Sequence, residues 1–195
     1  MIEVEIKFKL SDEQKRTLLD GAQFVSEELI HDVYYDSTNY ELTTKDFWLR
    51  TRNGNFMLKT PADSDNKTVF SMHELTDESL IRQALNLPAE PPLEQAIENA
   101  GFVPLYKITN SRIKYLKDDI TIDIDHADYG DFTYDLCELE TVVDRPEQIS
   151  QASLNLQIFA TKHGIQIQPA EGKLIHLIRL TNPDHYALLQ AARKK

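Results

Sequence analysis

Residues 2–10 read I-E-V-E-I-K-F-K-L, so apolar and charged side chains alternate without a break. Because successive side chains of a β-strand point to opposite faces, this pattern predicts a strand with one packed face and one charged face. The charged face carries both signs, since Glu3 and Glu5 are followed at the same spacing by Lys7 and Lys9. A strand of this kind predicts a sheet with one apolar face that packs in a core and one charged face.

Working outward from this strand, seven further segments are rich in β-branched and aromatic residues and predict strands. They are Gln23–Tyr35, Lys45–Asn53, Asn55–Thr60, Lys67–Leu75, Phe102–Leu116, Ile120–Ala127 and Phe132–Val143. Short turn sequences such as Asn53-Gly54 separate neighbours and favour antiparallel pairing. Eight antiparallel strands leave unpaired edges unless the sheet closes. We therefore expect an α+β fold built on an eight-stranded antiparallel β-barrel, or tunnel, with flanking helices.

The helices are predicted from caps and stop signals. The expected segments run from a cap at Ser11 or Asp12 to Asp20, from a cap at Thr76 over Asp77–Leu87, over Leu93–Asn99, from Pro146 to His163, and from Pro183 to the Lys194-Lys195 tail. No change of composition marks a boundary between domains. Residues 1–195 are therefore expected to form one domain that includes a C-terminal helix.

Composition limits the partners of this chain. Asp and Glu number 32 against 21 Lys and Arg, which gives a net charge of −11 among 195 residues. This charge opposes non-specific binding to nucleic acid or an anionic membrane. The single cysteine, Cys137, and the lack of a leader pattern or a long apolar run predict a cytoplasmic protein. The sequence leaves the oligomeric state open.

Charge recurs at i, i+2 spacing on several predicted strands. The pairs are Arg50/Arg52, Arg112/Lys114, Asp123/Asp125 and Glu138/Glu140. Any one pair could be the solvated face of a half-buried strand. The interleaving of carboxylate pairs with cationic pairs favours a charged barrel interior instead. Carboxylates suit a hard divalent cation and the cations suit phosphate oxygens, so the expected guest is a metal polyphosphate.

A set of motifs in chain order resembles the CYTH, or triphosphate tunnel metalloenzyme, family. The matching residues are E-V-E-I-K at 3–7, Y-Y-D at 34–36, W-L-R-T-R at 48–52, Lys59, Arg112 with Tyr115, I-D-I-D at 122–125, E-L-E at 138–140 and G-K-L-I at 172–175. The stretches D-F-W-L-R at 46–50, A-D-Y-G at 127–130 and N-P-D-H-Y at 182–186 look similar to the thiamine triphosphatase branch. The resemblance implies a tunnel enzyme that needs Mg²⁺ or Mn²⁺.

The resemblance also assigns site residues by position. It implies metal binding by Glu3, Glu5, Asp123, Glu138 and Glu140, and phosphate binding by Lys7, Arg50, Arg52, Lys59, Arg112 and Lys173. Asp125 shares a face with Asp123 and is a less certain ligand. The family often has a lysine where His73 stands here, so one phosphate contact is in doubt.

The expected reaction is hydrolysis of the terminal phosphate of a small-molecule triphosphate, with thiamine triphosphate as the leading substrate. Lys59 is the candidate catalytic residue, as an aid to the attacking water, and Trp48 the candidate contact for the organic group. Inorganic triphosphate and ATP, cyclised by an adenylate cyclase, remain alternative substrates. A polyphosphate-binding module without turnover is the alternative outside enzymes.

Overall fold

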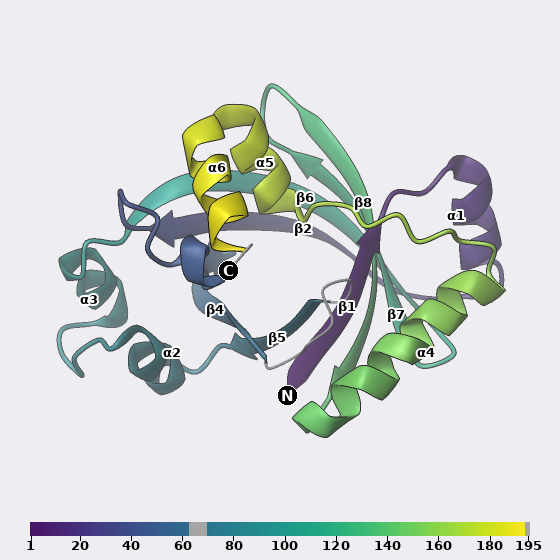
Figure 1. The fold of residues 1–195 in the computed structure, drawn as a ribbon, viewed down its shortest axis with the longest axis horizontal. Helices are drawn as coiled ribbons and strands as arrows, with labels where there is room; N and C mark the ends of the chain where they lie inside the picture. The colour runs from purple at the N-terminus through teal and green to yellow at the C-terminus, as the bar shows by residue number, and fades with distance from the viewer. Residues whose placement is uncertain (63–69, 194–195) are drawn as a thin grey trace. The chain divides into compact units, whose positions relative to one another are not determined.

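The computed structural model describes residues 1–62 and 70–193, and in it eight antiparallel strands close into a barrel (Figure 1). The strands are β1 Ile2–Phe8, β2 Gln23–Asp36, β3 Trp48–Arg52, β4 Asn55–Pro61, β5 Phe70–Leu75, β6 Val103–Lys117, β7 Ile120–Asp128 and β8 Thr133–Val143. Their order around the barrel is β1-β5-β4-β3-β2-β6-β7-β8. The α+β barrel expected from the alternating charges is confirmed.

The described residues also form six α-helices, and most of them begin where the sequence predicts. They are α1 Asp12–Leu19, α2 Glu78–Leu85, α3 Leu93–Asn99, α4 Ile149–Lys162, α5 Lys173–Thr181 and α6 Pro183–Ala192. Ser11 caps α1, because its hydroxyl accepts a hydrogen bond of 3.2 Å from the backbone N–H of Gln14. The cap of α2 is Asp77 and not Thr76, and α5 was not anticipated.

Several boundaries differ from the sequence expectation. The predicted strand Lys45–Asn53 starts only at Trp48, because Thr43–Lys45 forms a 3₁₀ turn and Asp46 is left-handed with φ 56°. The first strand ends at Phe8, two residues early. Residues 67–69 of the predicted strand Lys67–Leu75 lie outside the described residues. A 3₁₀ turn precedes α4, so the α-helix begins at Ile149 and not at Pro146.

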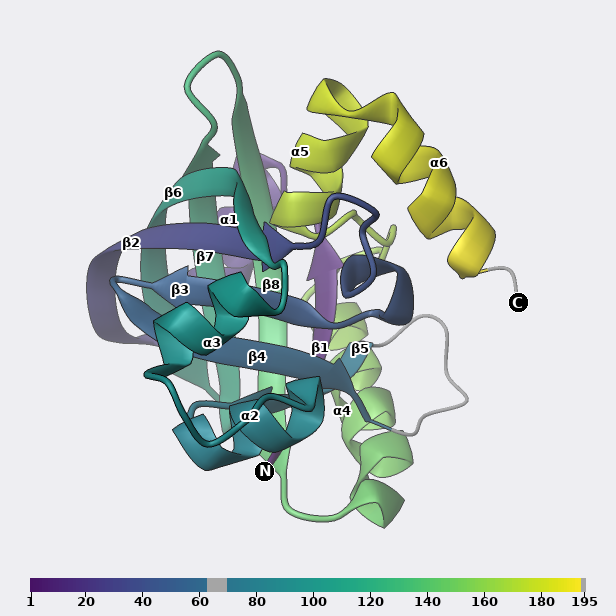
Figure 2. The same cartoon turned by 90° about the vertical axis from the view of Figure 1, so that its left-hand side faces the viewer.

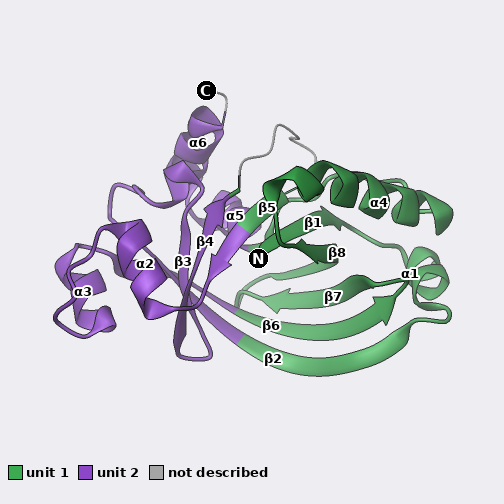
Figure 3. Ribbon diagram, turned by 90° about the horizontal axis from the view of Figure 1, so that it is seen from below, with its two compact units in different colours: residues 1–30, 62–72, 109–173 green, residues 31–61, 73–108, 174–195 purple. Residues whose placement is uncertain are grey.

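The chain divides into two compact units, coloured separately in Figure 3. Unit 1 comprises residues 1–30, 62–72 and 109–173, and its core lies between α4 and the strands β1, β7 and β8. Ile6, Ile122 and Leu139 are fully buried there against Leu156 of α4. Since α4 covers this face of the strands, the alternate face, which carries the charges, is left for a polar role.

Unit 2 comprises residues 31–61, 73–108 and 174–195. Its hairpin β3–β4 turns at Asn53-Gly54, where both residues have positive φ, 48° and 85°, as a tight antiparallel turn requires. Leu49 and Leu58 of the hairpin pack with Ile81 of α2 and Ile97 of α3. Figure 2 shows α2 and α3 beside β4, and α5 followed directly by α6. Among the described residues, no helix is long and apolar enough to cross a membrane.

Candidate functional site

The strand pairings of unit 1 place charged residues in one row across four strands. On β1 and β8, Lys7 lies opposite Glu138, and on β8 and β7, Glu138 lies opposite Asp123. On β7 and β6, Asp123 lies opposite Lys114. Side chains opposite each other in a sheet share one face, so the two carboxylates Glu138 and Asp123 face the same side, with a lysine at each end of the row. The i, i+2 spacing in the sequence creates this row.

Glu138 is the centre of the cluster, and it is only 5% exposed. Arg112 donates to its Oε2 at 2.6 Å and Lys173 to its Oε1 at 2.9 Å, while the Nζ of Lys7 lies 3.8 Å from Oε1. Burial opposes the charge of this carboxylate, but Lys173, Lys7 and Arg112 outweigh it and hold the pKa of Glu138 well below its usual range. Three cations from separate parts of the chain therefore converge on one carboxylate.

Asp125 holds two of these cations in place. Its Oδ1 accepts hydrogen bonds of 2.7 Å from Asn110 and from the Nε of Arg112, and its Oδ2 accepts from Arg112 and from Lys173. Burial raises the pKa of Asp125, but the opposing effects of Lys173 and Arg112 leave it lowered. Both oxygens are already used by protein donors. We therefore interpret Asp125 as a residue that orients the cations.

A second group of carboxylates lies beside this cluster, and burial raises the pKa of two of them, Glu140 and Asp123. Burial and the neighbouring Glu3, which is hydrogen-bonded to it, raise the pKa of Glu140 to about 8. Glu5 lies opposite Glu140 on the paired strands and forms an ion pair with Lys7. Burial likewise raises the pKa of Asp123 in spite of Arg112 and Lys114. At pH 7 Glu140 therefore keeps its proton, beside the carboxyl of Glu3.

These carboxylates fit a divalent cation by their chemistry. Hard ions such as Mg²⁺ prefer carboxylate oxygens, and an ion can replace the proton of Glu140. Within the part of the chain that the structure describes, no three acidic, histidine or cysteine side chains already converge as a metal site. Metal binding therefore requires Glu5 to exchange its partner Lys7 and Glu140 to lose its proton.

The remaining predicted residues lie in unit 2. Arg52 makes two hydrogen bonds to Asp32, of 2.9 and 2.8 Å, and Arg50 donates to Glu74 at 3.0 Å and to the hydroxyl of Tyr34 at 3.2 Å. Arg50 is 7% exposed, and its Nε has no hydrogen-bond partner among the described residues. Burial opposes its charge, but Tyr34, Asp32 and Glu74 keep the pKa of Arg50 above its ordinary value.

Lys59 and Trp48 lie opposite each other on β4 and β3. The Nζ of Lys59 is 4.0 Å from Glu74, and the guanidinium of Arg193 lies 6.0 Å from the centre of the Trp48 ring. Arg193 is held there by a 2.8 Å hydrogen bond to Asp46. The indole face of Trp48 is thus already close to a cationic group. This supports its capacity for cation–π contact.

A family model described as the CYTH domain matches residues 1–168, which is most of the chain. The chain belongs to the CYTH family. Known structures of the same fold include the PH1819 protein of Pyrococcus horikoshii OT3, with a TM-score of 0.65 at 22% identity over 91% of this chain and 99% of that one. A putative adenylyl cyclase from Hippeastrum, described as having a dominant triphosphatase activity, aligns with a TM-score of 0.56 at 20% identity over 91% and 95%. A putative adenylate cyclase of Bacillus halodurans aligns with a TM-score of 0.56 at 17% identity, over 92% of this chain and 97% of that one.

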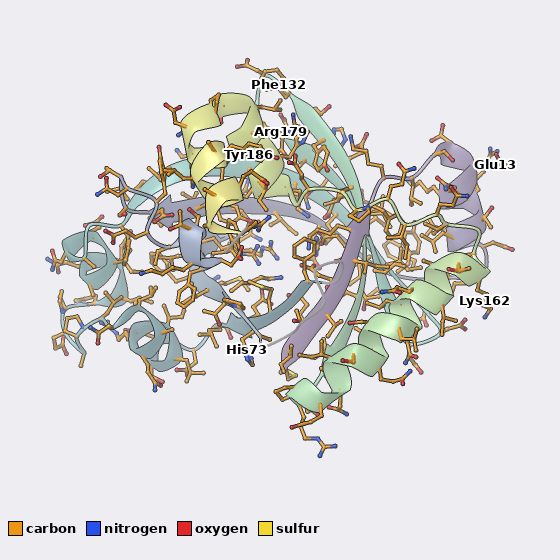
Figure 4. The ribbon with its side chains drawn as sticks, in the orientation of Figure 1. Glu13, His73, Phe132, Lys162, Arg179 and Tyr186 are labelled. Carbon is orange, nitrogen blue, oxygen red and sulfur yellow. The ribbon has the colours of Figure 1, made fainter. Side chains whose placement is uncertain are left out.

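In this CYTH protein, unit 1 brings together most of the charged residues that the resemblance selects. They are Glu3, Glu5, Lys7, Arg112, Asp123, Glu138, Glu140 and Lys173. Unit 2 holds Trp48, Arg50, Arg52 and Lys59, and His73 lies half-buried on β5 (Figure 4). Two contributors, Lys114 and Asn110, were not assigned. Lys114 could have been found from its i, i+2 spacing to Arg112, whereas Asn110 gives no signal in the sequence.

Proposed function

We propose that this CYTH protein is a metal-dependent triphosphatase that converts thiamine triphosphate to thiamine diphosphate and phosphate. One observation carries the proposal. Lys7, Arg112 and Lys173 converge on the buried Glu138, beside the hydrogen-bonded carboxyls Glu3 and Glu140. A cluster of this composition offers positive charge for a polyphosphate and oxygen ligands for a metal in one place.

The chemistry needs little beyond these groups. Phosphoryl transfer depends mainly on neutralising charge and positioning the attacking water in line with the leaving group. Lys7, Arg112 and Lys173 exchange Glu138 for phosphate oxygens, and Asp125 keeps its two hydrogen bonds to Arg112 and so orients the guanidinium group. A divalent ion held by the proposed carboxylate ligands, Glu3, Glu5, Asp123, Glu138 and Glu140, supplies further neutralisation. Arg50 and Arg52 are proposed as additional phosphate contacts, and Lys59 as the group that assists the water.

The choice of thiamine triphosphate rests on the motifs shared with the thiamine triphosphatase branch and on Trp48. The thiazolium ring of thiamine is cationic, and a cation over an indole face is stabilised by roughly 0.5–2 kcal/mol. We further propose that residues 1–195 act as one domain and that the protein is cytoplasmic. The cytoplasmic location is supported by the single cysteine, Cys137, which is buried and cannot form a disulfide within the chain.

A substrate panel tests the proposal. Thiamine triphosphate, inorganic triphosphate and ATP are each assayed with Mg²⁺, with Mn²⁺ and with EDTA, and phosphate and cyclic AMP are measured separately. We expect metal-dependent phosphate release with the highest kcat/KM on thiamine triphosphate. A preference for inorganic triphosphate would make that compound, and not thiamine triphosphate, the substrate. Cyclic AMP formed from ATP would indicate a cyclase. Binding without phosphate release would make the protein a polyphosphate-binding module.

A matched pair of lysine variants connects this activity to the cluster. Lys173→Ala removes a buried cation bound to Glu138 and should lower kcat/KM by about 100-fold or more. Lys162→Ala is the control, because Lys162 lies exposed on α4 and pairs only at the surface with Asp118 at 3.0 Å (Figure 4). Equal activities in the two variants would refute the cluster as the site.

A further inference from the structure

The segment that delivers Lys173 to the cluster has no regular secondary structure. Residues 165–172 link α4 to α5 without belonging to a helix or strand. Ile165, which is 3% exposed, anchors the start of the segment in the core of unit 1. Near its end, the N–H of Ala170 donates to the carbonyl of Lys7 at 2.9 Å. An irregular segment needs such contacts to place one side chain reproducibly, since its backbone entropy is otherwise high.

Two tyrosines hold the end of this segment from the hairpin of β7 and β8. The hydroxyl of Tyr134 donates to the carbonyl of Glu171 at 2.9 Å, and the hydroxyl of Tyr129 donates to the carbonyl of Lys173 at 2.8 Å. The two bonds fall on either side of Gly172. They hold the backbone from Glu171 to Lys173, which sets the direction of the Lys173 side chain.

The tyrosines are themselves fixed. Tyr134 is 4% exposed, with the Nζ of Lys9 4.8 Å from the centre of its ring. Tyr129 sits in the turn after β7, where its N–H donates to the carbonyl of Phe132 at 2.9 Å. Phe132 is labelled at this turn in Figure 4. The hairpin also carries Asp125 and Glu138, to which Lys173 binds. One hairpin therefore holds both the main chain and the ammonium group of Lys173.

We infer that Tyr129 and Tyr134 are positioning residues for phosphate binding, because their hydroxyls clamp the backbone around Gly172 and preset Lys173. This inference rests on the proposed role of Lys173 as a phosphate ligand. Without the clamp, Lys173 keeps its charge but loses its fixed position. The cost of ordering it then falls on substrate binding, which raises KM more than it lowers kcat.

The test removes the two hydroxyls and keeps the rings. Tyr129→Phe, Tyr134→Phe and the double variant are assayed with inorganic triphosphate, in the native background and in Lys173→Ala. We expect the double variant to raise KM by roughly 3- to 30-fold in the native background, from two lost hydrogen bonds, and by less than about 2-fold in Lys173→Ala. Tyr106→Phe is the matched control, since it also loses hydroxyl hydrogen bonds, to His185 and Asn182, and should leave KM unchanged.

A second readout separates this inference from the proposed function. The rate of Lys173 acetylation by acetic anhydride is measured by peptide mass spectrometry, with exposed Lys162 as the internal reference. The clamp predicts several-fold faster acetylation in the double variant. If Lys173 is acetylated faster in the double variant but the native protein releases no phosphate, the clamp is supported and the proposed triphosphatase activity is refuted. Unchanged acetylation together with unchanged KM, or an equal rise of KM in both backgrounds, would overturn the clamp.

Discussion

Two buried polar networks, one taken from each unit, are built from different kinds of group, and unit 2 also holds the ion pairs of Arg50 and Arg52. Unit 1 gathers full charges, with Glu138 shared by Arg112, Lys173 and Lys7. Unit 2 contains a chain of hydrogen bonds around His185, which is fully buried. Charged groups are costly to bury, and a network of ion pairs is weak evidence for a stabilising role. We therefore propose a functional role for the network of unit 1 and a stabilising role for the network of unit 2.

The network of unit 2 leaves few polar groups without partners. His185 contacts the hydroxyl of Thr43 at 2.7 Å and that of Tyr106 at 2.8 Å, and its ring stacks on Tyr40 with centroids 3.7 Å apart. Thr43 donates in turn to Asp36, which is 1% exposed. These bonds join α6 to the turn after β2. Burial lowers the pKa of His185, so the ring is neutral at pH 7.

The largest expected effect comes from the centre of unit 1. Glu138→Gln keeps the shape of the side chain but removes the charge that organises the three cations, so turnover should fall by at least about 100-fold. Circular dichroism should show a retained fold. Glu13→Gln, on the exposed surface of α1 (Figure 4), is the matched control. Wild-type activity of Glu138→Gln at saturating Mg²⁺ would remove Glu138 from the site.

In unit 2 we expect the opposite result, a loss of stability with turnover retained. His185→Phe retains a ring against Tyr40 but loses both side-chain hydrogen bonds and should cost about 2–4 kcal/mol of stability. For a chain of this size the melting temperature falls by roughly 4–16 °C. The kcat/KM of the folded variant should stay within about 2-fold of wild type. A large loss of turnover with an unchanged melting temperature would contradict the division of roles between the networks.

The raised pKa of Glu140 in unit 1 predicts a dependence of stability on pH. In the unfolded chain Glu140 ionises near its ordinary pKa of 4.5, whereas the folded protein keeps the proton up to about pH 8. This contribution to stability is therefore complete below pH 4.5 and is lost as the pH rises to 8. In EDTA, the melting temperature of Glu140→Gln should equal that of wild type at pH 4.5. At pH 8.5 it should lie at least ~2 °C above that of wild type. Equal melting temperatures at pH 8.5 would refute the raised pKa.

The smallest expected effect concerns the organic group of the substrate. Trp48→Ala should lower kcat/KM for thiamine triphosphate by about 2- to 30-fold relative to inorganic triphosphate, which has no cationic ring. Trp48→Phe, which keeps an aromatic face, should recover part of the loss. Equal losses on both substrates would make Trp48 a packing residue and remove the main argument for thiamine.

The sequence predicts the strands of this fold better than the contacts of its site. Alternation along residues 2–10 and the turn at Asn53-Gly54 are local patterns, so a reader of the chain can identify them. Helix α5 was missed because residues 165–172 contain no Ser, Thr, Asp or Asn that would mark its start. The role of Asp125 depends on Asn110, Arg112 and Lys173 meeting in space. Spacing along the chain carries no information about such a meeting.

The pairing of β1 with β8 has a consequence for the synthesis of the protein. Ile2 lies opposite Val143, and Lys7 lies opposite Glu138. Strand β1 leaves the ribosome before β8 and therefore waits for it before that edge is paired. Contacts so distant in sequence make folding slow, and an unpaired apolar strand is prone to aggregate during the delay. The alternating charges that mark the site also keep this early strand soluble while it waits.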